Sequence, residues 1–463
     1  MIINLLPLKT YIMIPKLFSI AILLLVQNLF AQSILGTWYG NLNTPGQILP
    51  LVFHVEQDGT SFKTFFDSPM QGAKGIPAKS TTFENSELTV MAPEFGITYK
   101  GKLNAEKIEG IFTQGESKTP FTLTRINTAP VVDRPQNPKL PYPYNSTVVA
   151  FKNETQGNEL AGTIAEPKNF DKNAPILVMI TGSGVQNRDE EMDGHKPFLV
   201  ISDHLARKGI ATLRLDDRGI GGSEKGKEEQ PTTADFVTDI NSAVNYLIKN
   251  GYTNIGLIGH SEGGMIAPMV ASENKNVKFI VLLAGPALPM IDVFVKQARS
   301  RLESVNVPKE DIDKDVANKR MILQFVKSYK GKDYKVDLKK FLADKFPDMK
   351  SQETDAYVRQ LGTNWWRYSL NINPQLYLEK LKIPVLAVNG SKDTQVSPKE
   401  NLASIKKSLE KAGNKKFEIV EFEGLNHFFQ TAETGSSLEY LEIAETISPK
   451  VLDKVSSWIA NLK

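Results

Sequence analysis

The sequence predicts two folded domains of different class: an antiparallel β-domain followed by an α/β domain with a mostly parallel sheet. Residues 33–128 alternate apolar and polar side chains in short runs, separated by turn formers such as Asp58-Gly59, which is typical of an antiparallel meander. From residue 175 onward, continuous apolar runs alternate with stretches of helical period, as expected for parallel strands buried on both faces by helices. Residues 129–144 hold five prolines, which favour an extended linker before an α/β domain spanning 145–463.

Length and composition agree with this division. A chain of 463 residues exceeds what one hydrophobic core usually fills. With 41% hydrophobic and 23% charged residues, the composition excludes disordered, collagenous and coiled-coil proteins. The 55 basic and 52 acidic residues give a net charge of +3 without a dense basic block, so we do not expect a nucleic-acid partner. The lack of cysteine excludes disulfides, thiolate nucleophiles and cysteine-bound zinc.

The first 32 residues have the layout of a signal peptide. Lys9 and Lys16 precede an apolar run over residues 17–26, and the small residue Ala31 suits cleavage after Ala31 or Gln32. The apolar run is too short for a comfortable membrane span, although an uncleaved anchor is the alternative. We therefore expect an exported protein, periplasmic or extracellular, with no stable membrane insertion once the signal peptide is removed.

Local patterns refine both domains. Residues 36–40, Gly-Thr-Trp-Tyr-Gly, are similar to the opening strand of lipocalin-like barrels and indicate a closed or nearly closed β-domain. A turn at residues 156–158 predicts an antiparallel hairpin at the start of the second domain. Candidate strands of its sheet are residues 176–180, 211–215, 255–258, 279–283, 385–388 and 417–422. Residues 286–380 are too long for a loop and have helical spacing, which predicts an inserted helical cap.

The motif that points most directly to chemistry is Gly259-His260-Ser261-Glu262-Gly263, which follows a predicted strand and opens a predicted helix. A serine at such a tight strand-to-helix turn needs small neighbours, and its hydroxyl then projects above the sheet. The N-terminus of the following helix directs N–H groups and positive dipole at developing negative charge. Ser261 is therefore the candidate nucleophile.

A serine hydroxyl is a weak nucleophile at neutral pH and requires a histidine base. Of the five histidines, only His427 lies downstream of Ser261, directly after the last predicted strand. The acid that orients the histidine should lie between them, since the chain order for this type of nucleophile is serine, acid, histidine. Asp393 follows the strand over 385–388 and is the candidate, with Asp292 as the reserve.

An oxyanion hole would pair the N–H of Glu262 with an N–H from the loop after an early strand. That loop is Thr181-Gly182-Ser183-Gly184-Val185, in which Ser183 is the preferred donor and Gly184 the alternative. Losing one such donor costs about 2.7–4 kcal/mol of transition-state stabilisation, so we expect a rigid loop.

Together these residues resemble the α/β-hydrolase superfamily, in particular bacterial esterases with an N-terminal β-domain, close to the dienelactone-hydrolase and serine-aminopeptidase-like groups. The likeness covers about residues 142–463. It includes residues 216–223, similar to the D-x-R-G-x-G-x-S loop of those enzymes, and the acid loop at 393–398. Thr181 departs from the histidine that is frequent there, which weakens the oxyanion assignment. The resemblance implies ester hydrolysis through an acyl-enzyme, without metal or organic cofactor.

The substrate is less well specified. We expect a small or medium carboxylic ester, with Trp365, Trp366 and Tyr368 of the cap either lining its pocket or packing within the cap. The alternative enzyme is an aminopeptidase, which would need an acidic group such as Glu262 or one in residues 189–191 for the substrate amine. The third interpretation is a catalytically silent protein that binds lipid or glycan through its β-domain. The oligomeric state stays open.

Overall fold

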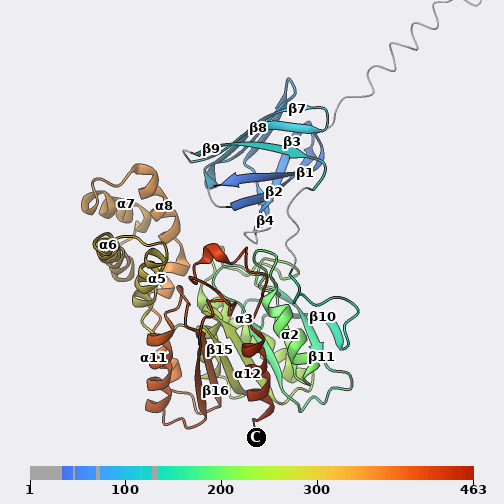
Figure 1. The fold of residues 1–463 in the computed structure, drawn as a ribbon, viewed down its shortest axis with the longest axis vertical. Coiled ribbons are helices and arrows are strands. Elements are labelled where there is room, and N and C mark those ends of the chain that lie inside the picture. Colours follow the sequence, from blue (N-terminus) through green and yellow to red (C-terminus); the bar gives the residue numbers. More distant parts are fainter. Residues whose placement is uncertain (1–33, 45–46, 69–72, 116, 128–133, 463) are drawn as a thin grey trace, which may run out of the picture. The chain divides into compact units, whose positions relative to one another are not determined.

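The computed structural model describes residues 34–462 except 45–46, 69–72, 116 and 128–133 (Figure 1). The predicted signal peptide, residues 1–32, and part of the predicted linker lie outside the described residues. The described residues form two compact units, the first within 34–127 and the second from Arg134 to Leu462. Among the described residues no helix is long and apolar enough to cross a membrane.

The first unit is a small antiparallel barrel, as predicted. Its sheet order is β2-β1-β9-β8-β7-β6-β5-β3-β4, and an additional β2–β3 pairing closes the ring with β4 outside it. Its described strands are β1 (Gly36–Thr44), β2 (Gln47–Asp58), β3 (Ser61–Ser68), β4 (Ala73–Pro77), β5 (Ser80–Glu84), β6 (Glu87–Ala92), β7 (Ile97–Asn104), β8 (Lys107–Gln114) and β9 (Ser117–Thr124). Trp38, Phe53, Tyr99 and Phe121 fill the interior, since each is at most 2% exposed.

The second unit is built on a mixed sheet whose order is β10-β11-β13-β12-β14-β15-β16-β17. The first two strands are antiparallel to their neighbours and the others pair in parallel. The described strands are β10 (Asn145–Lys152), β11 (Glu159–Glu166), β12 (Ile176–Ile180), β13 (Ala211–Leu215), β14 (Ile255–His260), β15 (Val277–Leu283), β16 (Val385–Gly390) and β17 (Phe417–Phe422). This is the α/β-hydrolase arrangement that the resemblance implies, and the predicted hairpin is β10–β11.

Helices cover both faces of this sheet, because alternate residues of each buried strand point to opposite sides. On one face Ile176 and Val178 of β12 pack with Val244 of α3 (Thr233–Lys249), α4 (Glu262–Ala271) and α11 (Pro398–Lys411). On the other, Leu177 and Met179 pack with α2 (Pro197–Arg207) and α12 (Pro449–Ala460). The parallel strands therefore end at one edge, where the loops after β12, β14, β16 and β17 carry the candidate residues.

The segment between β15 and β16 is helical, as predicted. It contains α5 (Met290–Ser304), α6 (Lys309–Ser328), α7 (Tyr334–Lys345), α8 (Ser351–Leu361), α9 (Asn364–Ser369) and α10 (Gln375–Leu378). The cap has a core of its own that extends to Ile372 and includes Met265 and Met269 of α4. Leu378 of α10 instead belongs to the core of the main sheet. The predicted boundary at residue 380 lies just after α10, whose Tyr377 still packs against the cap core.

Candidate active site

Ser261 occupies a sharp turn between β14 and α4. Its backbone has φ 52° and ψ −117°, a conformation that is strained for any residue with a side chain. The serine is the N-cap of α4, so Glu262 is the first residue of the helix and its N–H has no partner within the helix. The turn therefore places the hydroxyl beside an unsatisfied N–H at the positive end of the helix dipole.

The glycines of the motif are required because other backbone lies against them. A Cβ added to Gly263 would lie 2.1 Å from the carbonyl oxygen of Ile180, at the end of β12. One added to Gly259 would lie 2.1 Å from the carbonyl oxygen of Gly263. Backbone atoms cannot move aside as a flexible side chain can. The close approach brings the loop that follows β12 next to Ser261.

Asp393 and His427 meet directly. Nδ1 of His427 lies 2.8 Å from Oδ2 of Asp393, and both side chains are at most 3% exposed. The other oxygen of Asp393 accepts hydrogen bonds from the N–H groups of Gln395 (2.7 Å) and Val396 (2.8 Å). These two bonds hold the carboxylate in one orientation, so the loop after β16 presents a fixed acceptor to the imidazole.

Ser261 and His427 line the same cavity of about 560 Å³. Within the part of the chain that the structure describes, no hydrogen bond joins the Ser261 hydroxyl to the His427 ring. Catalytic hydrogen bonds are often long in ligand-free enzymes and shorten when substrate binds. The reserve acid Asp292 lies elsewhere, since it bonds Arg320 across the cap at 2.8 Å. The structure thus pairs His427 with Asp393 rather than with Asp292.

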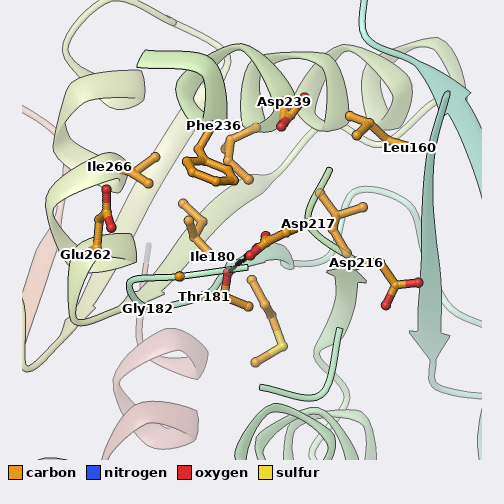
Figure 2. A pocket seen from close by; sticks show the side chains of 14 residues that line it. Leu160, Ile180, Thr181, Gly182, Asp216, Asp217, Phe236, Asp239, Glu262 and Ile266 are labelled. Atoms are coloured by element: carbon orange, nitrogen blue, oxygen red, sulfur yellow. Dashed lines mark hydrogen bonds between the residues drawn. The ribbon is translucent and has the colours of Figure 1, made fainter. Parts of the chain in front are cut away.

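The loop after β12, which carries the predicted oxyanion donor Ser183, is anchored by carboxylates. Glu190 accepts the N–H of Gly182 at 2.7 Å, so that N–H is already used. Asp217 accepts the hydroxyl of Thr181 at 3.0 Å and the N–H of Gln186 at 2.9 Å. Figure 2 shows the Thr181 and Asp217 side chains directed at each other on the wall of a small pocket of about 20 Å³. Both ends of the loop are therefore held, which leaves Ser183 between them to face the cavity.

Burial raises the pKa of Asp217 well above its usual value, although the bonds from Gln186 and Thr181 oppose that shift. Asp217 belongs to the D-x-R-G segment noted in the sequence. Arg218, next to it, binds both oxygens of the buried Asp239, at 2.8 and 2.9 Å. This segment therefore supports the loop after β12 and has a structural role.

Sequence reasoning missed a buried link between Glu190 and His260. Oε1 of Glu190 lies 2.9 Å from Nδ1 of His260, and Nε2 of His260 lies 3.0 Å from the carbonyl oxygen of His427. With Glu190 ionised, both partners are acceptors, so both ring nitrogens must donate and the ring is an imidazolium. Burial opposes this charge, but Glu190 and the carbonyl of His427 outweigh burial and raise the pKa of His260. The other oxygen of Glu190 is buried without a hydrogen-bond partner among the described residues.

This link connects the loop after β12 to the loop that carries His427. The sequence did contain one indication, because His260 directly precedes the nucleophile in the motif. Its partner Glu190 had no comparable indication, because it lies 70 positions away in the chain.

The side chain of Glu262 also lies in the site. It accepts hydrogen bonds from the Thr233 hydroxyl at 2.6 Å and from the Trp365 indole at 2.9 Å. Burial raises the pKa of Glu262, and bonds from Thr233, Trp365 and Ser183 oppose the shift. Glu262 therefore joins the nucleophile turn to helix α9 of the cap.

The predicted cap residues separate into two groups. Trp365 and Trp366 line the 560 Å³ cavity with Ser261, whereas Tyr368 packs against the cap core and is absent from the cavity wall. Among the described residues there is no group of three or more histidine, cysteine or carboxylate side chains that could hold a metal ion.

Comparison with known proteins extends this description. Residues 197–431, just over half of the chain, match the family described as serine aminopeptidase, S33. The chain is 26% identical over 308 residues to esterase EstD of Thermotoga maritima, a match that covers 65% of this chain and 66% of that protein. The chain thus spans slightly less than two thirds of this relative's length.

Solved structures with a similar fold include two esterases. Esterase Pf2001 of Pyrococcus furiosus is 15% identical, with a TM-score of 0.41 over 68% of this chain and 90% of that one. Est1E of Butyrivibrio proteoclasticus, solved with ferulic acid, is 21% identical, with a TM-score of 0.40 over 67% of this chain and 98% of that one.

Proposed function

Since the chain belongs to the serine aminopeptidase S33 family of α/β hydrolases, we propose that it hydrolyses carboxylic esters through an acyl-enzyme on Ser261. The observation that carries this proposal is that His427, bonded to the buried Asp393, lines the same cavity as the strained Ser261. The name of the Thermotoga maritima relative supports an ester as the substrate.

The hydrogen bond from His427 to Asp393 determines which nitrogen acts as the base. With Nδ1 donating to the carboxylate, Nε2 is the atom that accepts the proton of the Ser261 hydroxyl. The serine oxygen then bonds to the carbonyl carbon of the ester. His427 returns the proton to the alcohol as it leaves, and water attacks the acyl-enzyme by the same route to release the acid.

The negative charge on the tetrahedral oxygen would be stabilised by the N–H groups of Glu262 and Ser183. Glu262 is the first residue of α4, so its N–H and the helix dipole both favour the charge. Ser183 follows Gly182, whose own N–H is bonded to Glu190. Ser183 also lines the cavity with Ser261, whereas Gly184 is absent from its described lining, which favours Ser183 over Gly184 as the second donor.

The carboxylates that an aminopeptidase could use for a substrate amine are already engaged. Asp189 pairs with Arg214, Glu191 lies 3.6 Å from Lys196, and Glu190 pairs with His260. Glu262 accepts bonds from Thr233 and Trp365. These contacts favour an ester over a peptide with a free amine.

A fluorophosphonate probe followed by mass spectrometry tests the nucleophile. We expect labelling on Ser261, none in Ser261→Ala, and normal labelling in Ser437→Ala, because Ser437 is another serine of the cavity wall. Labelling elsewhere, or none in the wild type, would refute the assignment.

A panel of p-nitrophenyl esters and aminoacyl anilides then tests the substrate class. We expect turnover of esters that Ser261→Ala abolishes. Cleavage of anilides without cleavage of esters would show that the enzyme is a peptidase.

A further inference from the structure

The cavity above Ser261 changes from apolar to cationic along one helix. Met290, Phe294, Gln297, Arg301 and Ser304 of α5 all line it, at the spacing of a single helix face. The apolar end is nearest to Ser261, because α5 begins shortly after Leu283, whose carbonyl accepts the N–H of Ser261 at 2.9 Å. From Phe294 to Arg301 the helix advances by about 10 Å.

A second cation comes from the neighbouring helix. Lys319 of α6 is half-buried and lines the same cavity. Burial lowers the pKa of Lys319; Asp315 on the same helix partly offsets this, and the charge of Arg301 adds to the lowering. The two cations thus face one cavity from α5 and α6, two helices that also pair with each other through Arg299–Asp313 and Arg320–Asp292.

Neither cation forms an ion pair within the part of the chain that the structure describes, although Asp315 lies one turn before Lys319 on α6. No carboxylate of the described residues lies within ion-pair distance of Arg301 or Lys319, whereas Arg299 and Arg320 on the same two helices pair with Asp313 and Asp292. The amide of Gln297 adds a hydrogen-bond donor beside them on the cavity wall.

The carboxylates in the cavity wall belong to the opposite end. Within the described lining they are Glu190 and Glu262, which accept hydrogen bonds from His260 and Thr233 respectively. The carboxylates are therefore on the catalytic floor, where His260 pairs with Glu190, whereas the unpaired arginine and lysine are in the cap.

We propose that Arg301 and Lys319 form a subsite for a carboxylate at the far end of the substrate, so that the preferred substrates are esters whose acyl chain ends in an anionic group. This inference rests on the proposed esterase function and specifies its substrate class. The apolar part of α5 contacts the methylene chain, and the guanidinium and ammonium groups bind the terminal carboxylate. An ester with a positively charged end is disfavoured.

The test compares mono-p-nitrophenyl esters of dicarboxylic acids with p-nitrophenyl alkanoates of equal chain length, at low and high salt. We expect the wild type to prefer the anionic ester, most strongly at the lengths that span the apolar half of α5. The hydrogen bonds of the substrate carboxylate to Arg301 and to Lys319 should each raise kcat/KM by a factor of about 10. This is the lower end of the range for hydrogen bonds to charged groups, because Arg301 is exposed. The preference should shrink as salt is added.

In Arg301→Gln/Lys319→Met we expect kcat/KM for the anionic ester to fall by about 100-fold while that for the neutral ester is unchanged. Lys314→Met is the matched control, since Lys314 is an exposed lysine of the same helix outside the cavity wall. Arg301→Glu should abolish the preference, because the new carboxylate lies beside Lys319 and offsets its charge. Equal turnover of both esters by the wild type at every length, or equal losses on both in the double variant, would overturn the subsite.

Binding of the free dicarboxylates to Ser261→Ala, measured by calorimetry, separates this inference from the proposed function. We expect binding that the additional Arg301→Gln and Lys319→Met substitutions abolish, whether or not the wild type turns over any ester. Absence of dicarboxylate binding together with hydrolysis of neutral esters would refute the subsite and leave the esterase function standing. Dicarboxylate binding without any ester hydrolysis would refute the esterase function instead.

Discussion

Replacing Glu190 with glutamine should both destabilise the second unit and impair the site. Oε1 of Glu190 accepts hydrogen bonds from Gly182 N–H and His260 Nδ1. The other ring nitrogen of His260, Nε2, is hydrogen-bonded to the carbonyl oxygen of His427. A neutral imidazole has a single N–H and cannot donate to both partners. In Glu190→Gln with a neutral His260, at least one buried polar contact is therefore lost in every orientation of the amide.

The expected loss of stability has a lower and an upper bound. One unmet buried polar group costs about 1–3 kcal/mol. If His260 keeps its proton, the loss approaches that of a broken buried ion pair, about 3–5 kcal/mol. Displacement of the loops that carry Ser183 and His427 should also lower kcat, by about 100-fold for a shift near 1 Å.

The loss should also depend on pH. The pKa of His260 is higher in the folded protein than in the unfolded chain, where it is about 6.5. Protonation of His260 therefore stabilises the fold fully at pH values below about 6.5, and this contribution is lost as the pH rises through the folded-state pKa. The difference between wild type and Glu190→Gln should accordingly be largest near pH 6 and smaller near pH 9.

Urea unfolding followed by tryptophan fluorescence measures this effect, since Trp365, Trp366 and Trp458 all lie in the second unit. Glu191→Gln is the matched control, because its ion pair with Lys196 is partly exposed and 3.6 Å long, worth about 0–1 kcal/mol. If Glu190→Gln unfolds at the same urea concentration as Glu191→Gln, or if its deficit is the same at pH 6 and pH 9, the imidazolium link is wrong.

Three further substitutions test other parts of the site. Asp393→Asn should lower kcat by about 10⁴-fold with little change in KM, because the amide no longer selects the tautomer of His427 in which Nδ1 carries the hydrogen. Steady-state ester hydrolysis measures kcat, and a loss below about 10-fold would contradict the assignment. Gly263→Ala should cost at least about 1–3 kcal/mol in thermal unfolding, since its Cβ would lie 2.1 Å from the Ile180 carbonyl oxygen, and a fully stable variant would refute that crowding. Arg218→Met should lower the free energy of unfolding in urea by about 3–5 kcal/mol, because the buried Asp239 loses its guanidinium partner. Arg359→Met, at an exposed arginine, is the control and should leave the free energy of unfolding unchanged. Equal unfolding midpoints for the two variants would disprove a structural role for Arg218.

Local sequence patterns were sufficient for much of the fold. The candidate strands at residues 176–180, 211–215 and 417–422 match β12, β13 and β17 at both ends. For β12 the reason is that a strand buried on both faces is apolar along its whole length, a property visible in the sequence itself. The edge strand β17 is only partly buried and is marked instead by β-branched and aromatic residues. The motif around Ser261 was equally readable, since only glycine fits where backbone lies 2.1 Å from a Cβ position.

The contacts within the site could be predicted only where chain order constrained them. His427 was selected because it is the one histidine downstream of Ser261, and Asp393 because it follows a strand end between them. Asp292 met the same requirement of chain order, and only the packing of α5 against α6, which pairs Asp292 with Arg320, excluded it.

The sequence by itself determined the order of strands and helices and the strained turn at Ser261, because hydrophobic period and glycine spacing act between neighbours in the chain. Tertiary structure alone decided that Glu190 pairs with His260, and that Arg301 and Lys319 line one cavity. Such pairings join residues far apart in sequence, and no local pattern records which buried charge will meet which partner. They are set when helices and loops pack, since a buried charge must then find a partner or face a binding site.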